Sequence, residues 1–238
     1  MSERKSPHGV VIGVVGKAGS GKDTVARLIP NSKRFSFADP LKEFCGKLFG
    51  WSKEQLWGSS ELRNAHDSRF PREHGPWVPK GLCDLGCCSG QCSCCGVRTH
   101  DQNLYRCFLT PRFALQTLGT EWGRNCSEDI WAQYGVRRAQ EWFKDATSKP
   151  PFMSAGPVVA VFPDCRFVNE AKAIRDAGGQ VWRIDRPGSG LAGAAGTHPS
   201  EMEQESPEME ELITCTIHNR TTLEDLEKRV QLALAGLL

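Results

Sequence analysis

Residues 16–24 read Gly-Lys-Ala-Gly-Ser-Gly-Lys-Asp-Thr, and this stretch constrains the fold more than any other part of the chain. A glycine, four further residues and a Gly-Lys pair make up most of the pattern of a phosphate-binding loop. Asp23 stands where the pattern has Ser or Thr, and the hydroxyl residue Thr24 follows it. The alternative interpretation is a glycine-rich turn that contains a lysine by chance.

The sequence on both sides favours the phosphate-binding loop. Residues 10–15 (VVIGVV) are apolar and mostly β-branched, which predicts a buried parallel strand. Apolar residues between positions 25 and 29 suit a helix that packs back on this strand, and Pro30 ends it. A strand, a loop and a helix in this order are the context that such a motif requires.

A loop of this kind holds anions because its glycines let backbone N–H groups point inward at the start of a helix. We therefore expect nucleotide phosphates to bind to Gly16, Lys17, Ala18, Gly19, Ser20, Gly21, Lys22, Asp23 and Thr24. Lys22 is expected to reach the outer phosphates. Thr24 is the expected hydroxyl ligand of Mg²⁺, and Asp23 is expected to act through water.

The length of 238 residues allows one α/β domain with insertions and a sizeable core. The net charge of +2 gives no indication of a protein that binds nucleic acid through charge. No run of about 18 apolar residues is present, and residues 1–7 are not followed by the apolar core of a signal peptide. We expect a cytoplasmic protein with neither a membrane nor a nucleic-acid polymer as partner.

Strand and helix patterns alternate along the rest of the chain. Further strands are predicted at 34–37, 158–162, 180–184 and 214–218. Further helices are predicted at 41–49, 51–57, 110–118, 127–144, 167–177 and 221–234, with Asp39, Thr110, Ser127 and Thr221 as candidate caps. This alternation predicts an α/β fold.

Polar residues that follow the predicted strands are candidates for a ligand crevice, which forms at the carboxyl ends of parallel strands. Asp39 and Lys42 come after residues 34–37, although Asp39 could simply cap the next helix. Asp164 comes after residues 158–162. An acid at that place can organise Mg²⁺ beside a phosphate loop, whereas without such a loop Asp164 would be interpreted as a helix cap.

The helix that begins at Thr110 carries Arg112 and Gln116, and Glu121 and Arg124 follow it. We interpret these four residues as a clamp for a phosphate and a base, because arginine binds phosphate with two parallel hydrogen bonds. A solvated helix face is the alternative.

Residues 58–110 lose periodicity and predict an ordered but irregular insertion. Seven of the eleven cysteines fall between positions 83 and 107, a density that favours a metal in a reducing compartment. A subset of Cys83, Cys87, Cys88, Cys92, Cys94, Cys95, His100 and Cys107 would hold a structural Zn²⁺. Disulfides, free thiols and a catalytic metal are alternatives. Cys45, Cys126, Cys165 and Cys215 are expected to be ordinary buried residues.

Residues 186–207 are rich in Gly, Ala, Ser and Pro. This composition predicts either a mobile loop over the binding site or a linker. Arg186, His198 and Glu201 are its notable polar residues.

Six stretches, in the same order, resemble the bacteriophage deoxynucleoside monophosphate kinases. They are GKAGSGKDT (16–24), FADPLK (37–42), TPRFALQTLGTEWGR (110–124), DCRFVNE (164–170), RPG (186–188) and HPSE (198–201). The phosphate loop is generic, whereas the third and fourth stretches are much more specific. Phe162-Pro163 before Asp164 and the cysteine-rich segment depart from the family pattern.

The resemblance implies a P-loop kinase fold, which is a three-layer sandwich around a mainly parallel sheet. We expect a single kinase domain over 1–238, in which residues 58–110 form an acceptor-side insertion and residues 186–207 a lid or loop. The resemblance also implies phosphoryl transfer from ATP, with Mg²⁺, to a deoxynucleoside monophosphate.

In that reaction Lys22, Asp164, Arg166 and Arg186 are the candidate catalytic residues, with Thr24 and Asp164 near Mg²⁺. The candidate acceptor-binding residues are Asp39, Lys42, Arg112, Gln116, Glu121 and Arg124. A kinase for another small phosphorylated acceptor is one alternative. A nucleotide-dependent switch that uses zinc to build a partner surface is another, and a homodimer is compatible with the sequence.

Overall fold

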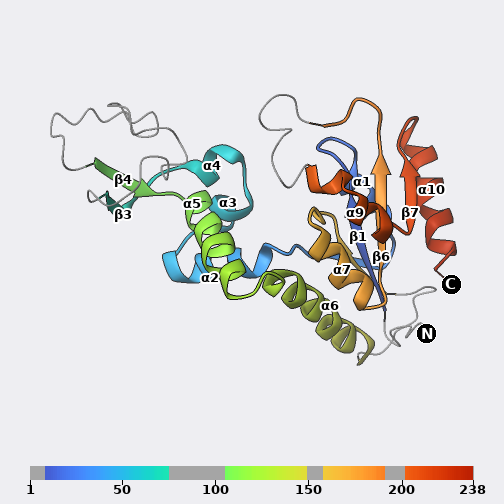
Figure 1. Cartoon of the computed structure of the whole chain (residues 1–238), viewed down its shortest axis with the longest axis horizontal. Coiled ribbons are helices and arrows are strands. Elements are labelled where there is room, and N and C mark those ends of the chain that lie inside the picture. Colours follow the sequence, from blue (N-terminus) through green and yellow to red (C-terminus); the bar gives the residue numbers. More distant parts are fainter. Residues whose placement is uncertain (1–8, 75–104, 149–157, 191–201, 238) are drawn as a thin grey trace. The chain divides into compact units, whose positions relative to one another are not determined.

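The computed structural model describes residues 9–74, 105–148, 158–190 and 202–237, which fall into two compact units (Figure 1). The first unit combines residues 1–40 and 123–238, and the second unit covers residues 41–122. None of the helices in the described part of the chain is both long enough and apolar enough to cross a membrane. The zinc candidates between positions 83 and 100 lie outside the described residues, as do His198 and Glu201.

The first unit is built on a five-stranded parallel sheet. Its strands follow the order β2 (Ser32–Arg34), β5 (Val159–Phe162), β1 (Val10–Val15), β6 (Gln180–Asp185) and β7 (Cys215–His218). In the central strand β1, Val10 pairs with Val159 of β5, and Ile12 pairs with Gln180 of β6. Because all five strands are parallel, their carboxyl ends meet at one edge, where ligands bind in open α/β sheets. The predicted α/β class is confirmed.

Helices cover both faces of this sheet, so the unit has three layers. On one face, Val11 and Val15 pack with α6 (Ile130–Ser148), α7 (Val168–Asp176) and α9 (Pro207–Leu212). On the other face, Ile12 and Val14 pack with α1 (Lys22–Leu28) and α10 (Leu223–Ala235). Burial on both faces explains why the strands appear in the sequence as continuous apolar runs.

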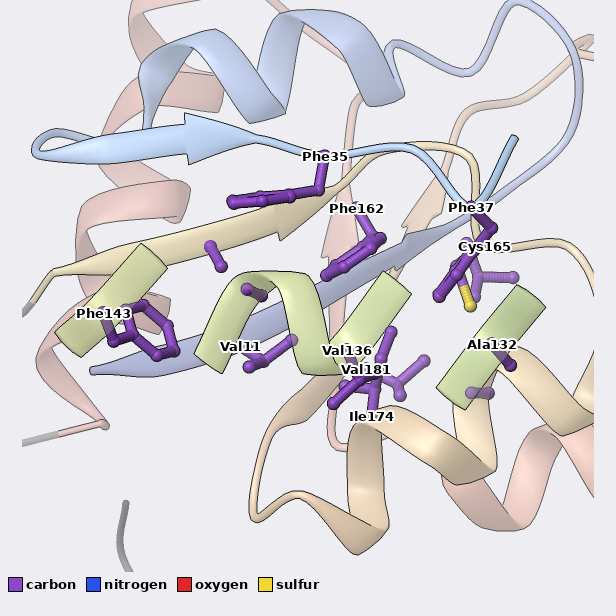
Figure 2. Packing of buried hydrophobic residues seen from close by; sticks show 14 of the residues in the cluster. Val11, Phe35, Phe37, Ala132, Val136, Phe143, Phe162, Cys165, Ile174 and Val181 are labelled. Atoms are coloured by element: carbon purple, nitrogen blue, oxygen red, sulfur yellow. The ribbon is translucent and has the colours of Figure 1, made fainter. Parts of the chain in front are cut away.

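Three aromatic rings fill the first of these cores beside the end of β5 (Figure 2). The ring of Phe162 stacks on Phe37 at a centroid distance of 4.5 Å and on Phe35 at 5.6 Å. Gly135 of α6 lets the helix approach, because an added Cβ would lie 2.7 Å from Phe37. This tight packing supports the turn that carries Asp164, two residues after Phe162.

The second unit is mainly helical. Its elements are α2 (Asp39–Phe49, beginning in the first unit), α3 (Lys53–Trp57), α4 (Ser60–Asn64), β3 (Asp67–His74), β4 (Tyr105–Leu109), α5 (Pro111–Gln116) and a π-helical turn, η1 (Thr117–Arg124, ending in the first unit). Strands β3 and β4 form an antiparallel pair. The Trp51 indole donates a 2.7 Å hydrogen bond to Asp67 at the start of β3, and Arg69 forms an ion pair with Asp67 at 2.6 Å.

The expectation of an irregular segment over 58–110 is therefore wrong for its described ends. Ser59 caps α4 by accepting a hydrogen bond from the N–H of Leu62, and β3 pairs with β4 across a long gap in sequence. Neither a five-residue helix nor a strand pair with distant partners leaves a clear period in the sequence. Thr110 and Pro111 start α5 as predicted.

Three other boundaries differ from the sequence-based expectations. Strand β2 covers Ser32–Arg34, so it begins and ends earlier than the strand predicted at 34–37. Helix α6 begins at Ile130 instead of Ser127, since the N–H of Ser127 still bonds to the carbonyl of Gly123 in the preceding turn. The cap of α10 is Thr222, whose hydroxyl accepts from the N–H of Asp225, and not Thr221.

Burial also departs from expectation at a few positions. Cys45 and Cys165 are buried as predicted and Cys215 is half-buried, but Cys126 is exposed. Leu223 is 60% exposed because it stands at the first position of α10.

Candidate nucleotide-binding site

The loop between β1 and α1 needs glycine at several positions. Gly16, Gly19 and Gly21 have φ angles of +153°, +77° and +102°, which L-residues rarely adopt. An added Cβ on Gly16 would lie 2.7 Å from the carbonyl oxygen of Ile184, and one on Gly21 would lie 2.6 Å from the Asn219 amide nitrogen. The loop is therefore closely packed against the strand ends, as a phosphate-binding loop must be.

Lys22, in the first turn of α1, folds back across this loop. Its ammonium donates hydrogen bonds to the carbonyl oxygens of Gly16 and of Lys17, the second at 2.8 Å. Both acceptors are neutral, and a phosphate oxygen would be a stronger, charged acceptor for the same ammonium. This geometry is compatible with the role predicted for Lys22.

The first two residues of the loop are held by a short 3₁₀ turn, η3 (Glu203–Glu205). The side-chain oxygen of Gln204 accepts a 3.1 Å hydrogen bond from the N–H of Gly16, and this contact is buried. Glu205 forms an ion pair with Lys17 at 2.7 Å, in a more exposed position. Sequence reasoning missed Gln204, because nothing in its local pattern marks a residue that acts 188 positions away.

The rest of the loop is held from the same strand ends. The carbonyl oxygen of Ala18 accepts a 2.8 Å hydrogen bond from the N–H of Gly190. The carbonyl oxygen of Gly19 accepts one of 3.2 Å from the guanidinium of Arg186, and that of Ser20 accepts one of 2.8 Å from the side-chain amide of Asn219. The segments that follow β6 and β7 thus fix the loop carbonyls. Arg186, a predicted catalytic residue, lies beside the loop in this arrangement.

Asp164 follows β5 at the same edge of the sheet. One carboxylate oxygen, Oδ2, accepts a 2.5 Å hydrogen bond from the hydroxyl of Ser36. The other, Oδ1, is buried, and the described part of the chain supplies no hydrogen-bond partner for it. Burial raises the pKa of Asp164, and the nearby carboxylate of Asp39 acts in the same direction. A buried acceptor without a donor is suited to a cation or to its bound water.

Two acidic residues named in the sequence analysis have defined contacts of their own. Asp39 accepts a 3.1 Å hydrogen bond from the N–H of Ser36, so Ser36 lies between two carboxylates. Asp39 belongs to the first turn of α2 instead of preceding it as a cap. Asp23 forms an exposed ion pair with Arg34 of β2. Thr24 is half-buried in the first turn of α1.

Glu170 organises the turn between Asp164 and α7. Its carboxylate is 7% exposed and accepts hydrogen bonds from the N–H groups of Arg166, at 2.8 Å, and Phe167, at 3.1 Å. Burial raises the pKa of Glu170 to about 7, and the Asp164 carboxylate also raises it. The guanidinium of Arg124 lies 4.3 Å from the ring centre of Phe167. The structure thus groups Arg124, Arg166 and Asp164 around one turn.

The remaining predicted acceptor residues lie in the second unit. Arg112 of α5 donates a 3.4 Å hydrogen bond to the hydroxyl of Ser60, and the ammonium of Lys42 lies 5.4 Å from the ring centre of Trp57. Gln116 ends α5, and Glu121 is exposed in η1. The packing within this unit therefore holds Arg112 and Lys42 through neighbouring helices, α4 and α3.

A cavity of about 660 Å³ opens beside the phosphate loop in the first unit. Its lining includes Lys17, Arg183, Arg186, Gln204 and Glu205, together with residues 187–189. A central parallel strand that runs through a glycine-rich loop into a helix, with an acid at the end of the neighbouring strand, defines a protein with the P-loop kinase fold.

Comparisons with known proteins lead to a particular family, although no family model matches the sequence. The chain is 30% identical over 228 residues to a protein of Acanthamoeba polyphaga mimivirus named "Putative deoxynucleotide monophosphate kinase", covering 93% of this chain and 94% of that one. It is 30% identical over 196 residues to the "Deoxynucleoside-5'-monophosphate kinase" of Escherichia phage T5, covering 70% and 72% of the two chains. The chain belongs to the deoxynucleoside monophosphate kinase family, which confirms the resemblance seen in its motifs.

A solved structure of TT1252 from Thermus thermophilus is also similar. It is 17% identical and has a TM-score of 0.47, with 97% of this chain and 99% of that chain covered.

Proposed function

We propose that the chain transfers the γ-phosphoryl group of ATP to a deoxynucleoside monophosphate, giving ADP and a deoxynucleoside diphosphate. Membership of the family supports this reaction. The structural observation that carries it is the loop itself, with Lys22 folded across two loop carbonyls and Asp164 at the same edge of the sheet.

The donor nucleotide would bind to residues 16–24. Inward N–H groups of the loop and the ammonium of Lys22 neutralise its phosphates, and Arg186 is close enough to the loop to join them. Arg166 is the second candidate for an arginine that stabilises the charge of the group in transfer. Binding of the donor and stabilisation of the group in transfer thus depend on cations and N–H donors that are already in position.

Thr24 and Asp164 fit a magnesium ion. The buried Oδ1 of Asp164, which receives no hydrogen bond from the described residues, and the hydroxyl of Thr24 are hard oxygen donors of the kind Mg²⁺ prefers. When bound, the ion would neutralise charge on the transferring phosphates.

The acceptor needs no general base, because the second pKa of a phosphate monoester is about 6 and its oxygen is largely ionised at neutral pH. Catalysis then depends on positioning and on charge neutralisation. Arg112 and Arg124 would hold the acceptor phosphate. Asp39, Lys42, Gln116 and Glu121 are the candidates for sugar and base contacts.

A structural Zn²⁺ in the cysteine-rich segment is part of the proposal. The donor set of thiolates and an imidazole has the chemistry that zinc selects. The segment contains few apolar residues, so metal binding would supply folding free energy that a hydrophobic core cannot.

The test is ADP production from Mg-ATP by purified protein, with each deoxynucleoside and ribonucleoside monophosphate supplied in turn. Strong stimulation by one or more deoxynucleotides is the expected result and also defines the base range. Stimulation by a non-nucleotide phosphate alone would indicate another kinase. Slow hydrolysis that no acceptor stimulates would indicate a nucleotide-dependent switch.

A further inference from the structure

Three consecutive residues of η3 bind separate parts of the nucleotide-binding unit. Gln204, which is 3% exposed, accepts the N–H of Gly16 at 3.1 Å. Glu205 forms the ion pair with Lys17, and Glu203 accepts a 2.8 Å hydrogen bond from the N–H of Val168 at the start of α7. The turn therefore connects the start of the phosphate loop to the turn that follows Asp164.

Gln204 accepts the N–H of a glycine that lies in a crowded part of the loop. Gly16 has a φ of +153° and packs against the carbonyl oxygen of Ile184 and the hydroxyl of Ser20. If the amide of Gln204 were removed, the buried N–H of Gly16 would lose its acceptor, which is costly in a buried place. The peptide would be expected to rotate, and the N–H groups that follow it in the loop would rotate with it.

The backbone around Gln204 is itself fixed. A guanidinium N–H of Arg183 donates a 3.1 Å hydrogen bond to the carbonyl oxygen of Gln204. Ser206 caps α9 by accepting from the N–H of Met209, whose side chain is fully buried in the core. The backbone on both sides of the Gln204 side chain is thus held by contacts of its own.

We propose that Gln204 is a positioning residue, which sets the start of the phosphate loop in the conformation that binds the donor nucleotide. This inference rests on the proposed function. Gln204 acts through the Gly16 peptide, whose N–H its side-chain oxygen accepts. Its side chain is neutral, and a carboxylate in its place would add negative charge beside a site built for phosphates.

The test compares Gln204→Leu and Gln204→Glu with the wild type. Leu has a similar volume and no acceptor, whereas Glu keeps an acceptor oxygen and adds a charge. We expect ATP affinity, measured by calorimetry, to fall by about tenfold or more in Gln204→Leu, because one unmade buried hydrogen bond is equivalent to that factor. In Gln204→Glu the hydrogen bond to Gly16 can still form, and ATP affinity should fall through the added negative charge beside the phosphates. The KM for ATP should rise in step, while the KM for the acceptor should stay within about twofold.

Gln140→Glu is the matched control for charge, because Gln140 is exposed on α6 and its change adds the same charge away from the loop. We expect it to leave ATP affinity unchanged. If the loss of ATP affinity in Gln204→Glu becomes smaller as the salt concentration is raised, this would support repulsion between the added carboxylate and the phosphates.

Unchanged ATP affinity in folded Gln204→Leu would overturn the proposal, even if the unfolding temperature fell, since that result would indicate a structural role alone. Should Gln204→Leu fail to fold, Gln204→Met decides the question, because it also removes the amide oxygen that accepts from Gly16 and has a flexible side chain that packs adaptably. If the wild-type protein binds ATP but no monophosphate stimulates its ADP production, the proposed function is contradicted. The comparison of ATP affinities would still test the role of Gln204.

Discussion

The hydroxyl of Ser36 donates a 2.5 Å hydrogen bond to Oδ2 of Asp164 and so joins the ends of the neighbouring strands β2 and β5. The bond orients the carboxylate so that its other oxygen, Oδ1, stays buried without a donor in the described part of the chain. The two strands thus meet at the place where we propose that a magnesium ion is held.

Ser36→Ala should therefore weaken the apparent affinity for Mg²⁺ and lower kcat by roughly tenfold, because Asp164 loses the donor that fixes it. Ser36→Thr keeps a hydroxyl and should stay within about threefold of wild type. Mg²⁺ titrations of the kinase rate at saturating ATP give both quantities. Equal Mg²⁺ dependence in the Ala and Thr variants would rule out the role proposed for this hydrogen bond.

Lys22→Ala should lower kcat by about 10²-fold or more, because a positioned cation that faces transferring phosphates contributes a large part of the rate. The fold should survive, since Lys22 is only half-buried and its partners are loop carbonyls. Steady-state ADP release and circular dichroism check the two claims. Lys47→Ala, at an exposed position on α2, is the control. A folded and fully active Lys22→Ala would disprove the assignment.

Glu170 predicts a dependence of stability on pH. Its pKa in the folded protein, about 7, lies above the ordinary value of 4.5, so between these values the folded state binds more protons than the unfolded state. Stability should accordingly fall as pH rises from about 4.5 to about 7, by about 3 kcal/mol from this one group, and then level off.

Glu170→Gln removes that titration while keeping one side-chain oxygen, which can accept from both backbone N–H groups as Oε2 of Glu170 does. Urea unfolding at pH 5 and pH 7.5 should show a smaller loss of stability with pH in the variant than in the wild type. Asp164, whose pKa is also raised by burial, acts in the same direction and remains in both proteins. If the wild type and Glu170→Gln lose the same amount of stability between pH 5 and pH 7.5, Glu170 does not titrate in this range.

Phe162→Ala should destabilise the fold by about 3–5 kcal/mol, the usual cost of removing a fully buried aromatic ring. Phe162 is completely buried and stacks on both Phe35 and Phe37 (Figure 2). Leu223→Ala is the control, because Leu223 is 60% exposed and its loss should change stability by less than about 0.5 kcal/mol. Urea unfolding curves of the two variants provide the comparison.

The parts that could be predicted from the sequence are those in which local chemistry dictates the structure. The strand from Val10 to Val15, the glycines of the loop and the start of α5 at Thr110 and Pro111 each follow from the residues present. Both faces of the sheet are buried, so its strands stood out as apolar runs. The motifs shared with the family then indicated which of the polar residues after these strands belong to the site.

The contacts that hold the site could not be predicted, because they join residues distant in the chain. Gln204 reaches Gly16, Asn219 reaches Ser20 and Ser36 reaches Asp164 only once the sheet has formed. Sequence patterns report periodicity and local caps, and a single hydrogen bond between distant residues leaves neither signal. The same limit applies to the pairing of β3 with β4.

Zinc is the last prediction, and its candidate ligands lie outside the described residues except for the backbone of Cys107 in β4. Purified protein should contain about one Zn²⁺ per chain by elemental analysis, because four of the thiolate and imidazole donors complete one tetrahedral site. Removal of the metal by a chelator should lower the unfolding temperature, and added Zn²⁺ should restore it. Cys126→Ser is the control, since Cys126 is exposed and free and should not change the metal content. Metal-free protein of unchanged stability after purification without chelators would contradict the zinc site and favour free thiols or disulfides.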